Sequence, residues 1–120
     1  MTKMKADTGE VFKAFNKYMT PPKLKYHLCI NDEMYLIINT KEARFSCQIS
    51  PADCSLLTHV CYINCATVRT EIVNNFNIIA KEQLSQNALK VLYERIKLSF
   101  SITQNQKNII LKELSKVIKV

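Results

Sequence analysis

Apolar side chains recur at every second position in two runs, residues 24–30 and 43–49, with polar side chains between them. This period of two is typical of strands with one buried face. The run between them, residues 34–39, is apolar almost throughout and suits a central strand. Two-residue breaks at Asn31-Asp32 and Thr40-Lys41 have the right length for tight turns. The pattern therefore predicts a three-strand antiparallel meander.

Helical spacing precedes the meander. Apolar residues between Val11 and Met19 recur at steps of three and four. Asp7 suits the N-cap of this segment, and Glu10 three residues later completes a capping box. Two prolines after Thr20 end the pattern, because proline lacks the amide proton that a helix needs. We predict an N-terminal helix from the Asp7 cap to Thr20.

A second helical pattern begins at Ser50-Pro51-Ala52-Asp53. Serine suits an N-cap, proline suits the first helical position, and the aspartate complements the positive end of a helix. Apolar residues then follow at steps of three and four: Leu57, Cys61, Cys65, Val68, Ile72, Phe76 and Ile79. Neither glycine nor proline occurs after residue 51. We predict a long helix to about Ala80, with the asparagines at 74, 75 and 77 as the residues that would interrupt it.

Two further helices are predicted at the C-terminal end. Ser85 can cap one of them, and Thr103, with Gln106 three residues later, can cap the other. Residues 97–103 alternate like a strand, but we favour a helix end and a linker there. The predicted fold class is α+β in a single domain, residues 1–120. Its elements are an N-terminal helix, a three-strand antiparallel meander, a long helix, and one or two further C-terminal helices.

Composition argues against an enzyme. The chain has one glycine in 120 residues, Gly9. Phosphate-binding loops and the sharp turns that present nucleophiles usually contain glycine. The carboxylates lie mainly at predicted turns and caps. We therefore predict no catalytic residues, no cofactor and no metal ion.

Five cysteines, an odd number, follow a polar N-terminal segment that does not resemble a secretory signal. They predict free, buried thiols in a reducing compartment, cytoplasmic or nuclear. A zinc site made by His27, Cys29, Cys61 and Cys65 is the alternative, although no C-x2-C motif supports it. A catalytic cysteine–histidine pair that uses His27 or His59 is a second alternative role for these cysteines.

The net charge is +7, and both ends of the chain are basic. Lys and Arg outnumber Asp and Glu by six to two in residues 1–25 and by nine to four in residues 67–120, while the middle carries two against four. Such a chain attracts polyanions. Lysine outnumbers arginine 14 to 3, whereas specific nucleic-acid sites favour arginine. Nucleic acid is therefore the second choice of ligand.

Residues that could bind a partner or a polyanion fall on three predicted elements. The outer face of the meander should carry Lys25, His27, Tyr35, Ile37, Arg44 and Gln48, and the sequence leaves open whether a C-terminal helix covers it. The N-terminal helix adds Lys13 and Lys17. The last helix adds Lys112, Lys116 and Lys119.

The order helix, meander, helix over residues 8–66 resembles that of double-stranded RNA-binding domains and of the small Alu-binding subunits of the signal recognition particle. The glycine-containing loop and the basic start of the second helix that mark double-stranded RNA binders are absent, since that helix here begins Ser-Pro-Ala-Asp. The resemblance therefore implies a fold rather than a function.

The sequence thus predicts a small, basic, intracellular, non-catalytic interaction module that dimerises or docks in a larger protein assembly. Residues 10–19 and 85–118 are the expected contact segments, because their apolar stripes exceed the partners visible in the sequence. The alternative is nucleic-acid (RNA) binding through the N-terminal and C-terminal lysines. A membrane surface is not an expected partner.

Overall fold

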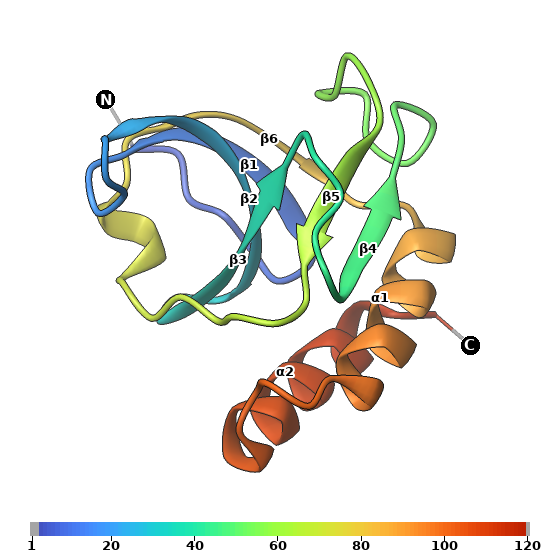
Figure 1. Ribbon diagram of the computed structural model, residues 1–120. Helices are drawn as coiled ribbons and strands as arrows, with labels where there is room; N and C mark the ends of the chain where they lie inside the picture. Colours follow the sequence, from blue (N-terminus) through green and yellow to red (C-terminus); the bar gives the residue numbers. More distant parts are fainter. Residues whose placement is uncertain (1–2, 120) are drawn as a thin grey trace.

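The computed structural model describes residues 3–119. Within that part of the chain, a six-stranded antiparallel sheet is followed by two C-terminal helices (Figure 1). The strands are β1 (Glu10–Asn16), β2 (Lys23–Asn31), β3 (Met34–Asn39), β4 (Ser46–Ile49), β5 (Cys61–Asn64) and β6 (Ile78–Gln83). A 3-10 turn, η1 (Val73–Asn75), precedes β6, and the helices are α1 (Gln86–Leu98) and α2 (Gln104–Val117). The order across the sheet is β4-β5-β3-β2-β1-β6.

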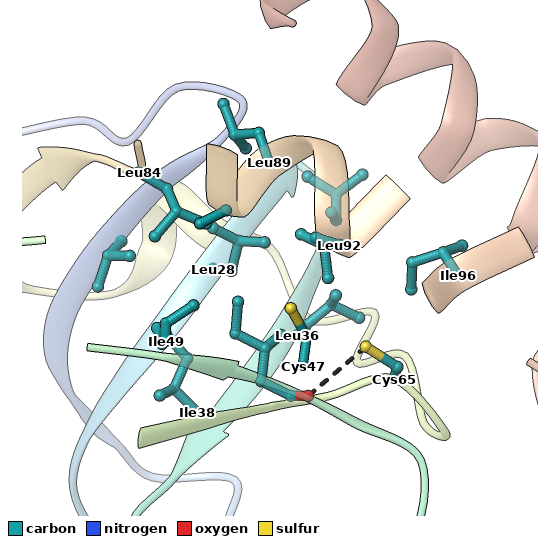
Figure 2. Close-up of a cluster of buried hydrophobic side chains, with 14 of the residues drawn as sticks. Leu28, Leu36, Ile38, Cys47, Ile49, Cys65, Leu84, Leu89, Leu92 and Ile96 are labelled. Carbon is teal, nitrogen blue, oxygen red and sulfur yellow. Dashed lines mark hydrogen bonds between the residues drawn. The ribbon is translucent and has the colours of Figure 1, made fainter. Parts of the chain in front are cut away.

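The larger hydrophobic core lies on the face of the sheet that the two helices cover. Leu28, Leu36 and Ile38 project from the central strands towards Leu89 and Leu92 of α1 (Figure 2). α2 adds two fully buried residues, Ile110 and Leu114. Figure 1 shows α1 and α2 side by side at one end of the molecule, next to β4. The helices therefore gain their stability by burying one apolar stripe each against the sheet.

A smaller core lies on the opposite face. Phe12 and Tyr35 project there from β1 and β3, and Val73, Phe76 and Ile78 cover them from the segment around η1. Both faces of the central strands are thus buried, which explains why residues 34–39 are apolar almost throughout.

Gly9 lies in the turn just before β1, close to β6 and α2. Its φ is +82°, in the left-handed region that favours glycine. A Cβ atom there would lie 2.6 Å from Nε2 of Gln83 and 3.2 Å from Cγ2 of Val117. The close approach of α2 and β6 to this turn therefore requires the single glycine of the chain.

The predicted N-terminal helix is wrong, because residues 10–16 form β1. The expected capping-box contact exists, since the Asp7 amide donates to Glu10 Oε1 at 2.6 Å, but it closes the tight turn that contains Gly9. In β1 the pattern has period two: Val11 is buried on the helix-covered face, and Phe12 and Ala14 are buried on the other. Pairing on both sides of the strand outweighed the helical spacing of the aromatic residues.

The three-strand meander is also wrong, although its first two strands pair as expected. β2 and β3 form an antiparallel hairpin, with Leu28 opposite Leu36. The third predicted strand is shortened to β4, Ser46–Ile49, and pairs with β5 instead of β3. β5 lies between β3 and β4, where Ile63 is paired with Ile38 on one side and with Cys47 on the other and packs in the larger core.

The predicted long helix over residues 51–80 is replaced by turns, β5, η1 and β6. Asp53 again uses its cap chemistry to close a turn, accepting a hydrogen bond from the Ser50 amide at 3.0 Å. Asn64 ends β5 by accepting bonds from the Ala66 and Thr67 amides, a turn that competes with helix. The resemblance to double-stranded RNA-binding domains rested on this helix and the first one, and it fails with them.

The two C-terminal helices are confirmed, with their caps. The Ser85 hydroxyl accepts from the Ala88 amide and the Thr103 hydroxyl accepts from the Gln106 amide. α1 ends at Leu98 and residues 99–103 form a linker, as expected for this stretch.

Candidate functional site

The predicted outer face of the meander is largely covered. His27 and Tyr35 are fully buried and Ile37 is nearly so. The cover comes from the N-terminal residue Ala6 and from the loop around Phe76, whereas the C-terminal helices cover the other face. Three of the six residues predicted on this face therefore belong to the smaller core.

A chain of hydrogen bonds runs through this core from β1 to the surface. The Asn16 amide group donates to His27 Nε2 at 3.2 Å and to the Tyr35 hydroxyl at 3.1 Å. The Tyr35 hydroxyl donates to the carboxylate of Glu71, which also accepts from Arg69 Nε at 3.1 Å. Within the described residues, every buried side-chain nitrogen and oxygen has a partner. The network is therefore fully satisfied, as a buried polar cluster must be to stabilise the fold.

The geometry of the network fixes the protonation state of His27. Its Nε2 accepts from Asn16, so the ring proton lies on Nδ1, which donates to the Phe12 carbonyl at 3.3 Å. Burial lowers the pKa of His27 to about 4. Burial and the hydrogen bond to Glu71 raise the pKa of Tyr35 to about 12. Both rings are thus neutral over a wide pH range.

The same network holds the turn that follows β1. Asn16 Oδ1 accepts from the Tyr18 amide at 2.9 Å, and Arg69 donates to the Tyr18 carbonyl at 3.4 Å. The Tyr18 ring packs edge-on against Phe76, with centroids 5.8 Å apart. The turn is fixed in position by side chains from three separate segments, so the surface beside it is preorganised.

That surface, which we call the hairpin patch, combines exposed apolar residues with lysines. Phe15 and Leu24 lie directly opposite each other on β1 and β2, and they are 55% and 46% exposed. Ile79, 58% exposed, lies at the β6 bulge and by alternation points away from the face that buries Ile78. The hairpin patch comprises Phe15, Leu24 and Ile79 with the lysines Lys13 and Lys17.

Apart from Ile79, the hairpin patch lies in a segment of the chain without acidic residues. Residues 11–31 contain four lysines and no aspartate or glutamate. Lys13 Nζ lies 5.6 Å from the centre of the Tyr26 ring, and Lys17 Nζ lies 5.4 Å from that of Tyr18. Figure 1 shows the turn between β1 and β2 at the opposite end of the molecule from the helices. The patch is therefore separate from the surface of α1 and α2.

The apolar half of this patch was missed from sequence. The helical spacing between Val11 and Met19 predicts a buried Phe15, and the alternation over residues 24–30 predicts a buried Leu24. The helices reach Val11 and Leu28 on this face of the sheet and leave its end uncovered. The acid-free run of residues 11–31 is the sequence signal that could have pointed to the region.

The remaining predicted residues are dispersed. Lys25 lies on the opposite side of β2 from Leu24 and donates to Asn39 Oδ1 at 2.7 Å, and burial lowers its pKa. Gln48 is exposed on the edge strand β4, and Arg44 is exposed beside Phe45. Lys112 and Lys116 lie on α2, where Lys116 pairs with Glu113, and Lys119 follows the helix.

All five cysteines are free and buried. Cys61 and Cys65 belong to the larger core and Cys29 to the smaller one, on opposite faces of the sheet. The four ligands of the alternative zinc site are therefore split, and no cluster of metal-binding side chains occurs among the described residues. Burial raises the pKa of Cys29 to about 12, which opposes the thiolate that a cysteine–histidine nucleophile requires.

Within residues 3–119, neither helix has the length and apolar composition needed to cross a membrane. The comparisons with known proteins add no family: neither a protein-family model nor a curated protein sequence matches the chain.

Proposed function

We propose that the protein is a non-catalytic interaction module that docks onto an acidic protein partner through the hairpin patch. The observation that carries the proposal is the pairing of Phe15 with Leu24, both about half exposed, inside an acid-free lysine-rich hairpin. Apolar anchors surrounded by a charged rim are the usual anatomy of a protein-binding surface. The partner that fits is an amphipathic segment with apolar side chains flanked by carboxylates.

A protein ligand fits this surface better than single-stranded nucleic acid does. Nucleic-acid grooves stack successive bases on open aromatic faces. Here Lys13 lies over Tyr26, whose hydroxyl donates to the Leu56 carbonyl at 2.9 Å. Lys17 lies over Tyr18, so two of the three nearby aromatic rings are occupied. At the centre of the patch, Leu24 provides apolar contact and no stacking.

The test is a titration with a synthetic helical peptide that carries a leucine stripe flanked by glutamates. We expect a dissociation constant on the order of 10 µM, with a modest salt dependence, because apolar contact and charge both contribute. Phe15→Ser or Leu24→Ser should weaken binding about tenfold, the effect of losing roughly 1.4 kcal/mol at an anchor.

The matched control is Leu98→Ser, which changes an even more exposed leucine on α1 and should leave peptide affinity unchanged. A scrambled peptide of the same composition controls for charge alone. The proposal is overturned if the striped peptide does not bind at 1 mM. It is also overturned if single-stranded oligouridylate binds more tightly than the peptide and loses orders of magnitude in affinity between low and moderate salt, the signature of nucleic-acid binding.

A further inference from the structure

The outward face of α1 carries a second exposed apolar stripe. Val91 is 50% exposed and Leu98 is 63% exposed, and they lie two turns apart on the same side of the helix. The inward face is the one that packs in the core, with Leu92 and Ile96 fully buried. A shallow hollow of about 340 Å³ lies along the stripe, lined by Lys90, Val91, Glu94, Arg95 and Leu98.

The stripe is self-complementary in the placement of its charged and apolar residues. Glu94 and Arg95 are adjacent and lie midway between Val91 and Leu98. If a second α1 runs antiparallel across it about a twofold axis between Glu94 and Arg95, each valine faces the other copy's leucine. The same operation places each glutamate opposite the other copy's arginine, so two ion pairs flank the axis. A surface that complements itself under a twofold rotation is the requirement for an isologous dimer.

We infer that a second copy of this chain occupies the α1 stripe, in an antiparallel helix pair. The choice of a second copy rests on this charge complementarity, because a partner of one charge sign would leave either Glu94 or Arg95 against a like charge. Glu94 is free to form the contact, since its pair with Lys97 is long, at 3.8 Å, and exposed.

The expected dimer is weak. The stripe offers two apolar side chains and two charges from each copy, well below the area of a standard stable interface. We expect a dissociation constant on the order of 100 µM. The inference does not depend on the hairpin patch, which lies at the other end of the molecule (Figure 1).

Sedimentation equilibrium over about 10 µM to 1 mM protein tests the inference. Glu94→Arg places arginine opposite arginine, and Arg95→Glu places glutamate opposite glutamate, so each single change should weaken the dimer about tenfold. The double variant Glu94→Arg/Arg95→Glu restores opposite charges and should recover the wild-type affinity within about threefold. Lys112→Glu, a charge reversal on the exposed side of α2, should have no effect.

Leu98→Ser should abolish dimerisation and leave peptide binding at the hairpin patch intact, whereas Leu24→Ser should do the reverse. Circular dichroism of each variant controls for folding. A wild-type protein that stays monomeric at 1 mM would overturn the inference. So would a dimer that survives Leu98→Ser, or a double charge swap that fails to restore what the single swaps remove.

Discussion

Asn16 shows how one buried polar side chain can connect a core to a surface. It is fully buried, and its amide group bonds His27, Tyr35 and the backbone of Tyr18 at once. The sequence pattern predicts a helix at this position and does not mark Asn16 as a buried residue. Its function depends on the register of β1 against β2, which pairs it with Lys23 and could not be read from a local pattern.

Replacing Asn16 with alanine should destabilise the protein by roughly 2–3 kcal/mol, because three buried or half-buried polar groups each lose a hydrogen bond. Urea unfolding of Asn16→Ala measures this loss. Asn105→Ala, an exposed asparagine on α2, is the matched control and should change stability by less than about 0.7 kcal/mol. Equal effects of the two changes would show that the network contributes nothing.

His27 should make the protein acid-sensitive. Its pKa in the folded state is about 4, below the ordinary value of 6.5, so the unfolded chain binds more protons between those pH values. Stability contributed by neutral His27 is therefore present above about pH 6.5 and is lost as the pH falls towards 4, by roughly 3 kcal/mol. Denaturant unfolding at several pH values measures the slope.

The His27→Gln variant separates this effect from that of the carboxylates. It should be less stable at pH 7 and show a flatter decline between pH 6.5 and 4 than the wild type. Parallel declines of the two proteins would rule out His27 as the source.

At the scale of elements, the same local chemistry caps helices in one half of the chain and closes turns in the other. Asp7 with Glu10, and Ser50 with Asp53, make the predicted hydrogen bonds in turns. Ser85 makes the equivalent bond at a true helix start. A cap residue therefore identifies where a helix can begin, and the packing available afterwards decides whether it does.

This explains which elements could be predicted. The C-terminal helices were predictable, because their apolar stripes and caps agree and local contacts dominate. Residues 51–83 were not predictable, because β5 and β6 pair with strands far away in the sequence. The cysteines in this segment are buried by that pairing, but their spacing is also that of a helix with one buried face. The lysines of the hairpin patch, Lys13 and Lys17, could be predicted from the sequence. The exposure of its apolar residues could not, because it depends on how much of the sheet the C-terminal helices cover.

The two helix caps should differ in strength. Ser85 accepts from Ala88 and also donates to Asp53 Oδ1 at 2.8 Å, tying α1 to the turn before β5, whereas Thr103 caps an exposed start. We expect Ser85→Ala to cost about 2 kcal/mol and Thr103→Ala about 1 kcal/mol. Urea unfolding compares them directly, and a larger loss for Thr103→Ala would contradict the bridging role of Ser85.

At the scale of the whole molecule, the fold places two exposed apolar surfaces at opposite ends. The hairpin patch is held by the buried network around Asn16, and the α1 stripe is held by the packing of Leu92 and Ile96. A weak dimer through α1 would present two hairpin patches at once. Such an arrangement would raise the avidity for a partner that carries two acidic segments.

The central claim is that the hairpin patch binds an acidic amphipathic protein segment, and the most direct measurement is nuclear magnetic resonance mapping of backbone amides during titration with the striped peptide. The account predicts saturable shifts at Lys13, Phe15, Leu24 and Ile79, with Val91 and Leu98 unchanged. Shifts confined to α1 and α2, or none at 1 mM peptide, would contradict it.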